Sequence, residues 1–419
     1  MTSSGDNPVD RALGAVLASI ENSDRGVVAN YIPELASADP TSAAIALTST
    51  SGHLYAVGDH DVAFTLQSIS KPFVYALVLG QLGVDRLHAH VGFEPSGEPF
   101  NAISLDDSGR PANPMINAGA IVTSALVGGS DEAERFESIR ATLSAFAGRE
   151  LEMDERVYAS EAATGDRNRA LAHLARAAGN LARQPDDAAD GYFRQCALLV
   201  TTTDVSVMGA TLANGGVNPV TGVEVVLPSV ARRTLSLMAS CGMYDHAGEW
   251  AYRVGMPAKS GVSGGIVAVK PGQFGIGVFS PGLDAAGNSS RGVAALTLLA
   301  DEFGLHLLEH PATPATSVDR LINDPIAGLT VVLRGELTFT GVEHVAYEIA
   351  HLLADDATSA LTIDTSSVTR ITPAAQRLLD AVVAQARSQG RSVRVGEAAD
   401  MPLVVDPGDG PDPVGDRIG

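Results

Sequence analysis

The stretch QSISKPFVYALVLGQLG, residues 67–83, places a serine and a lysine three positions apart at the start of an apolar run. The apolar residues after Lys71 predict a helix that begins close to Ser68. On a helix, residues three positions apart lie on the same face. A serine at a helix N-terminus meets backbone N–H groups without partners, and a desolvated lysine one turn away could accept its proton. The spacing is that of serine-based acyl transfer, although by itself it arises by chance in most proteins.

A second element, MPAKSGVSGGIVAV at residues 256–269, contains Lys259, Ser260 and Gly261 just before a predicted strand. Lys-Ser-Gly on a strand beside the site is the companion of Ser-x-x-Lys in penicillin-recognising hydrolases. The alternative is a glycine-rich hairpin with an exposed lysine. Of the 28 lysines and arginines in the chain, only Lys71, Lys259 and Lys270 are lysines. Two of the three in matching elements favour a site.

Charge and cysteine content exclude several classes of protein. The formal charge of −21 repels nucleic-acid phosphates and anionic membrane surfaces, so we expect no nucleic-acid or membrane partner. Two cysteines, Cys196 and Cys241, cannot form a disulfide framework, and the first residues lack a secretory signal. We therefore expect a cytoplasmic protein with reduced thiols. The ten histidines show no metal-ligand spacing, so no metal or cofactor is predicted.

The length of 419 residues and the changes in pattern along the chain predict an α/β multidomain protein. Residues 1–310 mix alternating strands, such as SAAIALTST and HLYAVGD, with Ala/Leu-rich helices, such as NRALAHLARAAGNLA, and form the expected catalytic domain. Residues 311–325 predict a linker, because proline interrupts them. Residues 326–400 show βαβαβ order, and residues 401–419 predict a disordered tail.

Further motifs follow one another along the large domain. In chain order they are YIPELA with Tyr31, NPMINAGAI with Asn117, SEAATGDRNRALA with Glu161 and Asn168, YFRQC with Tyr192, and CGMYD with Tyr244. Together with the two Ser and Lys elements, and in this order and spacing, they resemble the serine-dependent glutaminases. The resemblance covers roughly residues 9–306.

The resemblance implies a β-lactamase/transpeptidase-like αβα sandwich with a helical subdomain. It also implies hydrolysis of L-glutamine to L-glutamate and ammonia by a homo-oligomer, a dimer or a tetramer. Ser68 corresponds to the nucleophile and Lys71 to its activating partner, with Tyr31, Tyr244 and Lys259 beside the reaction centre. The positions that match the family's glutamine-binding residues are Ser68, Asn117, Glu161, Asn168, Tyr192, Tyr244 and Val262.

These residue types suit a free amino acid. Glu161 can bind an α-ammonium, while asparagine and tyrosine side chains donate neutral hydrogen bonds. Val262 can contribute only its backbone N–H, which could form an oxyanion hole with that of Ser68. Either Lys71 or Tyr244 could pass a proton to leaving ammonia. Taken singly, each residue has a structural alternative: the asparagines could be helix caps, the tyrosines core residues, and Glu161 and Arg167 a solvated pair.

The C-terminal domain resembles the STAS domains, on its βαβαβ order and on LTIDTSSVTRITPAAQRLL, residues 361–379. A regulatory or interaction role, with a protein or ligand as partner, is the expectation, and an inert accessory domain is the alternative. Two other functions stay open for the whole chain. One is a different amidase or a β-lactam hydrolase on the same fold, and the other is a catalytically silent protein whose STAS-like domain carries the function.

Overall fold

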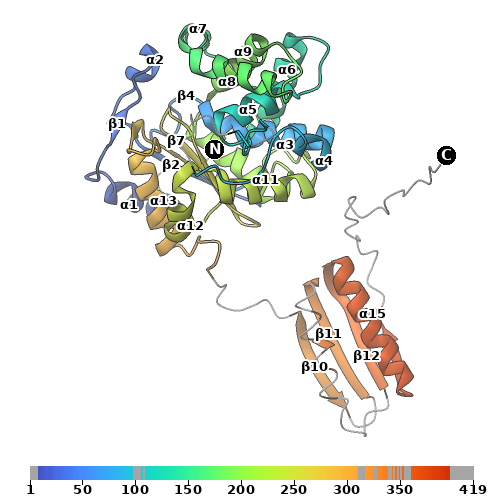
Figure 1. The fold of residues 1–419 in the computed structure, drawn as a ribbon. Helices are drawn as coiled ribbons and strands as arrows, with labels where there is room; N and C mark the ends of the chain where they lie inside the picture. The colour runs from blue at the N-terminus through green and yellow to red at the C-terminus, as the bar shows by residue number, and fades with distance from the viewer. Residues whose placement is uncertain are drawn as a thin grey trace, which may run out of the picture. The chain divides into compact units, whose positions relative to one another are not determined.

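The structure is a computed structural model that describes residues 8–97, 105–106, 109–309, 317–324, 328–337, 342, 345–346, 349, 352 and 360–396. The chain divides into two compact units, residues 1–309 and residues 310–419 (Figure 1). The tail predicted at residues 401–419 and the first part of the predicted linker, residues 311–316, lie outside the described residues. Within the described part of the chain, no helix is long and apolar enough to cross a membrane.

The large unit is built on a five-stranded antiparallel sheet with the order β3-β2-β8-β7-β6. The strands are β2 (Ala44–Ser49), β3 (Leu54–Gly58), β6 (Ala258–Ser260), β7 (Gly265–Lys270) and β8 (Phe274–Phe279). Two of them, β2 and β3, confirm the strands predicted from alternating hydrophobicity. The sheet thus joins an N-terminal hairpin to three strands that lie about two hundred residues later in the chain.

Helices cover both faces of this sheet. Along β7, Val267 and Val269 belong to the core beneath α10 (Thr202–Ala213), while Ile266 and Ala268 belong to the core beneath α1 (Pro8–Ser19) and α13 (Ser290–Glu302). This alternation follows from the two-residue period of a strand, and both faces are apolar because both are buried. The predicted αβα sandwich is therefore confirmed.

Close packing of α10 on the sheet depends on glycines in β8. A Cβ added at Gly275 would lie 1.9 Å from the backbone nitrogen of Ala210, and one at Gly277 would lie 2.3 Å from the carbonyl oxygen of Thr202. Because any larger residue would push the helix away, these two positions set the distance between helix and sheet.

A helical region packs beside the sandwich (Figure 1). Its helices contain half of the predicted site residues: Lys71, Asn117, Glu161, Asn168 and Tyr192. Asp131 caps α6 (Glu132–Ala147) by accepting from the backbone N–H of Glu134, and Gly148 ends it with a left-handed φ of 77°. The other helices of the region are α3 (Ser70–Leu82), α4 (Val84–His88), α5 (Asn117–Ala125), α7 (Glu155–Thr164), α8 (Asp166–Ala177), α9 (Pro185–Cys196) and α11 (Pro228–Cys241). The short elements are β1 (Val27–Val28), α2 (Pro33–Ala36), β4 (Phe64–Thr65), the 3-10 helices η1 (Gln67–Ile69) and η2 (Tyr244–His246), β5 (Leu199–Val200), α12 (Ala247–Arg253) and β9 (Gly282–Leu283).

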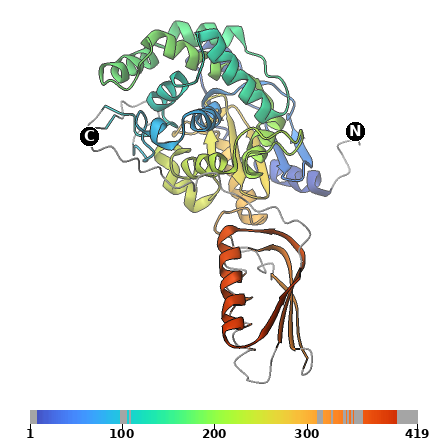
Figure 2. The same cartoon turned by 90° about the vertical axis from the view of Figure 1, so that its right-hand side faces the viewer.

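The small unit is a four-stranded sheet with the order β10-β11-β12-β13. Its strands are β10 (Val318–Asp324), β11 (Gly328–Leu337), β12 (Ala360–Ile371) and β13 (Ser392–Val395). The first pair is antiparallel and the other two pairs are parallel. Figure 2 shows α15 (Pro373–Ser388) running along one face of this sheet. The apolar core between them includes Leu333, Ile363 and Leu379, and the unit has the β and α order expected of a STAS-like domain.

One predicted boundary is wrong. The prediction placed residues 318–324 in a linker, yet they form β10, which pairs with β11. Proline occurs at Pro311, Pro314 and Pro325, which leaves ten residues free of proline between the second and the third. Because those residues keep all their backbone N–H groups, they can pair with the neighbouring strand. The predicted sheet of three strands therefore gains a fourth, antiparallel strand.

Candidate active site

A cavity of about 370 Å³ opens in the large unit at the position of Ser68. Its volume lies within the range of small-molecule sites. Seven residues of the predicted site line it: Tyr31, Ser68, Asn117, Glu161, Asn168, Tyr192 and Val262. The other three, Lys71, Tyr244 and Lys259, are buried and contact these lining residues or one another. The tertiary structure thus brings together residues from positions 31 to 262.

The backbone around Ser68 is unusual. Ser68 is the middle residue of η1, which runs directly into α3. Gln67 has a φ of 48° and Tyr244 a φ of 57°, and no other non-glycine residue of the described segments has a positive φ. This left-handed conformation is disfavoured for residues with a Cβ and often marks functional sites. Both strained residues flank Ser68, because Gln67 precedes it in the chain and Tyr244 hydrogen-bonds with its side chain.

Lys71 lies one turn after Ser68 and is only 1% exposed. Its Nζ donates to the carbonyl oxygen of Met115 at 3.2 Å and to Oδ1 of Asn117 at 2.7 Å. Burial lowers the pKa of Lys71 to about 7. In its neutral form the amine has two N–H groups and one lone pair. The two acceptors match the two N–H groups, so the lone pair of neutral Lys71 stays available as a base.

Tyr244 connects the Ser68 element to the Lys259 element. Burial raises the pKa of Tyr244 to about 12, an effect that hydrogen bonding with Ser68 partly opposes. Lys259, on the edge strand β6, is 0% exposed and its Nζ lies 3.8 Å from the centroid of the Tyr244 ring. Burial and the neighbouring Lys71 charge lower the pKa of Lys259 well below its usual value. The hairpin with an exposed lysine, considered as the alternative, is therefore excluded.

Glu161 is the carboxylate of the cavity. It is 6% exposed, and burial raises its pKa. Its Oε1 accepts from the hydroxyl of Tyr31 at 2.7 Å and from Nε2 of Gln67 at 3.2 Å. Two donors on one oxygen fix the orientation of the carboxylate, and they leave Oε2 as the atom that can receive a charged donor from a ligand.

Neutral amide and hydroxyl groups line another part of the cavity. Nδ2 of Asn117 donates to Oδ1 of Asn168 at 3.0 Å, and the hydroxyl of Tyr192 donates to Oδ1 of Asn117 at 3.4 Å. Burial raises the pKa of Tyr192 well above its usual value, so it stays protonated. Because Asn117 also accepts from Lys71, this group joins the binding cavity to the candidate base.

The turn after β6 packs tightly against η1. A Cβ added at Gly261 would lie 3.0 Å from the carbonyl oxygen of Leu66 and 3.5 Å from Cβ of Gln67. Gly261 thus lies against the residues on either side of Ser68, and both Ser68 and Val262 line the cavity. The N–H groups at the start of a helix lack intrahelical partners, as at Ser68 in η1. Ser68 and Val262 are therefore the candidates for a pair of backbone N–H donors to one oxygen atom.

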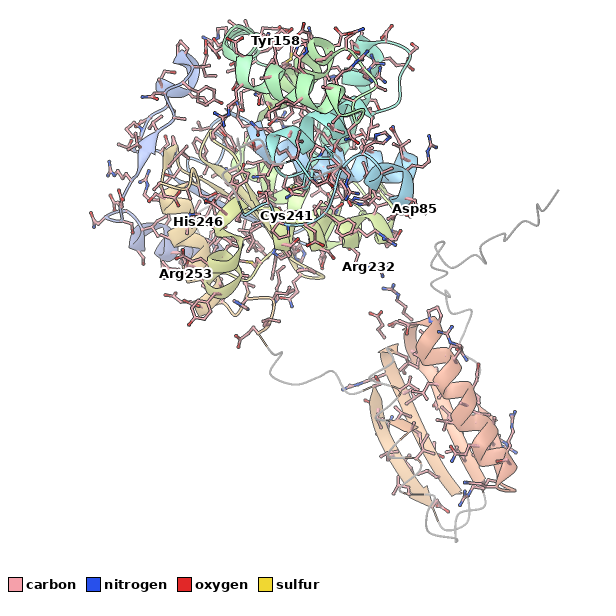
Figure 3. The ribbon with its side chains drawn as sticks, viewed as in Figure 1. Asp85, Tyr158, Arg232, Cys241, His246 and Arg253 are labelled. Atoms are coloured by element: carbon pink, nitrogen blue, oxygen red, sulfur yellow. The ribbon has the colours of Figure 1, made fainter. Side chains whose placement is uncertain are left out.

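The structure excludes one alternative, gives one cysteine a place at the cavity and adds one residue. Glu161 is buried while Arg167 is exposed, so they are not a solvated pair. Cys196 is free, as predicted, and it is buried and lines the cavity. Cys241 is also free and buried and lies at the end of α11 inside the large unit (Figure 3). Gln67 was not singled out from the sequence, although its place next to Ser68 was a usable signal. Among the described residues no cluster of three or more metal-ligating side chains occurs.

Comparison with known proteins places this geometry in a family context. The Glutaminase family profile matches residues 26–308, and a profile described as Mlab, STAS domain, matches residues 324–404. The chain is 54% identical over 314 residues to Glutaminase 2 of Bradyrhizobium diazoefficiens, covering 74% of this chain and 50% of that protein. It is 42% identical over 396 residues to Glutaminase of Corynebacterium glutamicum, covering 94% of this chain and 95% of that one. The chain thus spans about half the length of the Bradyrhizobium relatives and nearly all of the Corynebacterium relative.

Similar solved structures include glutaminases as well. The crystal structure of Mglu superposes with a TM-score of 0.87 and 40% identity, covering 94% of this chain and 100% of that one. Mglu in its glutamate form gives the same TM-score at 37% identity, covering 94% of this chain and 100% of that one. The probable glutaminase ybaS superposes with a TM-score of 0.71 and 38% identity, covering 73% of this chain and 99% of that chain.

Proposed function

Because this chain belongs to the glutaminase family, we propose that it hydrolyses the side-chain amide of L-glutamine to L-glutamate and ammonia. One observation carries the proposal. Ser68 lines a cavity that also contains the buried carboxylate of Glu161, and it lies one turn before Lys71, whose pKa is about 7. The glutamate form of the related Mglu supports glutamate as the product. The family profile and the relatives described above, all glutaminases, favour this function over the second candidate, a β-lactam hydrolase.

Ser68 is the nucleophile and Lys71 its base. Neutral Lys71 takes the proton of Ser68 Oγ as Oγ attacks the amide carbon, and the carbonyl electrons move to oxygen. The backbone N–H groups of Ser68 and Val262 receive this oxyanion. The C–N bond then breaks, and the nitrogen leaves as ammonia with a proton from Lys71 or from the Tyr244 hydroxyl. The product of this half-reaction is a γ-glutamyl ester of Ser68.

Water completes the cycle. Lys71 removes a proton from a water molecule as it attacks the ester, a second tetrahedral intermediate forms, and the bond from carbon to Ser68 Oγ breaks. The proton returns to Ser68, and glutamate is released. Because each step uses the same base and the same oxyanion donors, one buried lysine serves both half-reactions.

Glu161 selects the α-ammonium group of the substrate. Oε1 of Glu161 is occupied by Tyr31 and Gln67, so Oε2 binds the ammonium. Asn168, Tyr192 and the Arg167 side chain at the cavity wall are the groups suited to the α-carboxylate. Amides that lack the α-ammonium or the α-carboxylate group therefore bind weakly, because they leave these charged and polar side chains without a partner.

The test is ammonia release from L-glutamine by the purified chain, compared with L-asparagine and D-glutamine. We expect a preference for L-glutamine and a complete loss in Ser68→Ala with an unchanged melting temperature, since only the nucleophilic oxygen is removed. A glutamine-derived diazoketone should label Ser68. Turnover of Ser68→Ala above a few per cent of wild type, or a label on Cys196, would refute the serine mechanism.

For the small unit we propose a regulatory or interaction role, supported by its match to a STAS domain and by its own compact core. We also propose that the protein is a cytoplasmic homo-oligomer. The location is supported by two cysteines that are both free and buried. Light scattering of the purified protein and fractionation of its native cell test these two points.

A further inference from the structure

Two buried polar side chains behind the cavity wall, Ser70 and Gln195, are connected by hydrogen bonds to the residue before Ser68. Nε2 of Gln195 donates to Oγ of Ser70 at 2.9 Å. Oγ of Ser70 donates in turn to the carbonyl oxygen of Gln67 at 2.7 Å. Both side chains are 0% exposed. Through this series of hydrogen bonds, α9 is tied to the segment that bears the proposed nucleophile.

The residue at the end of the series is strained. Gln67 has a φ of 48°, which a residue with a Cβ adopts only when its surroundings enforce it. Its carbonyl oxygen belongs to the peptide plane that leads into Ser68, and peptide planes are rigid. A change in the dihedral angles of Gln67 would therefore move Ser68. It would also move Nε2 of Gln67, which donates to Glu161.

The hydrogen bond between Ser70 and Gln195 does not by itself explain why these polar residues are buried, because it adds little to the stability of the fold. Oε1 of Gln195 is buried and accepts no hydrogen bond from the described residues. A buried carbonyl oxygen without a donor costs stability, whereas an apolar side chain of the same length costs nothing of the kind. The benefit of the pair therefore lies in the geometry that it imposes on Gln67.

We propose that Ser70 and Gln195 are positioning residues, which hold Gln67 in its left-handed conformation and so place Ser68 Oγ for attack. The inference rests on the proposed hydrolysis by Ser68. Neither side chain lines the cavity, so neither touches substrate. Ser70 also hydrogen-bonds with Cys196, which lines the cavity, whereas the hydrogen bond of the Gln195 side chain leads to Gln67 through Ser70.

The large unit offers a matched control. Ser206 on α10 is also 0% exposed, its Oγ donates to a carbonyl oxygen three residues earlier at 2.8 Å, and it has a side-chain partner, Thr48 Oγ1, at 2.7 Å. The variants Ser70→Ala and Ser206→Ala therefore remove the same hydroxyl group and the same kind of backbone contact, and Ser70→Ala additionally removes a hydrogen bond with Cys196. Only the first contact leads to Gln67.

We expect Ser70→Ala to lower kcat ten- to a hundredfold, because small misplacements of reacting atoms have effects of that size, and Ser206→Ala to change it less than twofold. The labelling rate of Ser68 by the diazoketone should fall in parallel. The acidic limb of the pH profile should stay near 7, since Lys71 keeps its contacts. A general disturbance of the site would move that limb.

Gln195→Met separates positioning from stability. We expect its kcat to fall as in Ser70→Ala while its melting temperature is unchanged or higher, and the double variant to fall no further than either single one. A kcat within twofold of wild type in Ser70→Ala or Gln195→Met would overturn the positioning role. An inactive wild-type chain would instead refute the proposed function, and this inference with it.

Discussion

Replacing Lys71 by arginine separates proton transfer from positive charge. Lys71 is 1% exposed, and burial lowers its pKa to about 7, so a large fraction is neutral near pH 7. A guanidinium keeps its proton and cannot act as a base. General-base catalysis contributes roughly a hundred- to ten-thousandfold. We therefore expect Lys71→Arg to lose about a thousandfold in kcat and to be nearly as inactive as Lys71→Met.

The pKa of Lys71 also determines how rate and stability depend on pH. A fall in the pKa of Lys71 from 10.5 to about 7 means that the folded protein disfavours the charged form of this lysine by about 5 kcal/mol, compared with the unfolded chain. Between these values the unfolded chain binds more protons than the folded one, so the free energy of unfolding rises with pH across that window. The cost of Lys71 is thus greatest below pH 7. Lys71→Met should be more stable there, by at most about 5 kcal/mol, and this difference should vanish towards pH 10.5.

The assay is the initial rate of ammonia release from L-glutamine between about pH 5 and about pH 9 for wild type, Lys71→Arg and Lys71→Met. Thermal melts of each variant control for folding. We expect the wild-type rate to rise as the pH passes through about 7, where Lys71 loses its proton. A folded Lys71→Arg enzyme with more than about a tenth of wild-type kcat would refute the role of Lys71 as the base. The proton would then have to pass elsewhere, with Tyr244 the next candidate.

Three further predictions concern the carboxylate and the small unit. Glu161→Gln should raise KM about ten- to a hundredfold with little change in kcat, since charged hydrogen bonds contribute roughly 1.5 to 3 kcal/mol; a pure kcat effect would place Glu161 in the chemistry. A chain of residues 1–309 should keep glutamine hydrolysis, and a folded but inactive truncation would show that the small unit is needed for activity. Mass spectrometry of the native protein should find no stoichiometric phosphate on Ser366, Ser367 or Thr372; the Thr372 hydroxyl already caps α15 by accepting from Ala375.

Part of the candidate site could be predicted from local sequence signals, and the rest followed from the resemblance to the serine-dependent glutaminases. Ser68 and Lys71 share a helical turn, and Lys259 begins a strand-and-turn element whose residue order is visible along the chain. The alternating pattern at residues 42–50 and 53–59 predicted β2 and β3, since a two-residue period depends only on neighbours. The boundary near residue 310 lies close to the division between the two units.

Other features depend on partners that are remote in the chain. Residues 318–324 form a strand because their backbone groups hydrogen-bond with those of β11, which follows them in the chain but is positioned by the rest of the sheet. Gln67 adopts a positive φ beside Ser70, whose own partner, Gln195, lies 125 residues away. Neither residue type predicts such a contact, because Ser and Gln are usually solvated.

The sequence alone therefore indicated an α/β multidomain protein and the order of its motifs, because residue type and spacing can be read along the chain. Through the resemblance to the serine-dependent glutaminases it also indicated the nucleophile and base candidates. The tertiary structure decided the properties that let these residues react: the lowered pKa of Lys71, the hydrogen bonds that occupy Oε1 of Glu161, and the left-handed backbone of Gln67 before Ser68. Desolvation and hydrogen-bond geometry depend on which distant atoms pack around a group, and only the folded chain brings those atoms together.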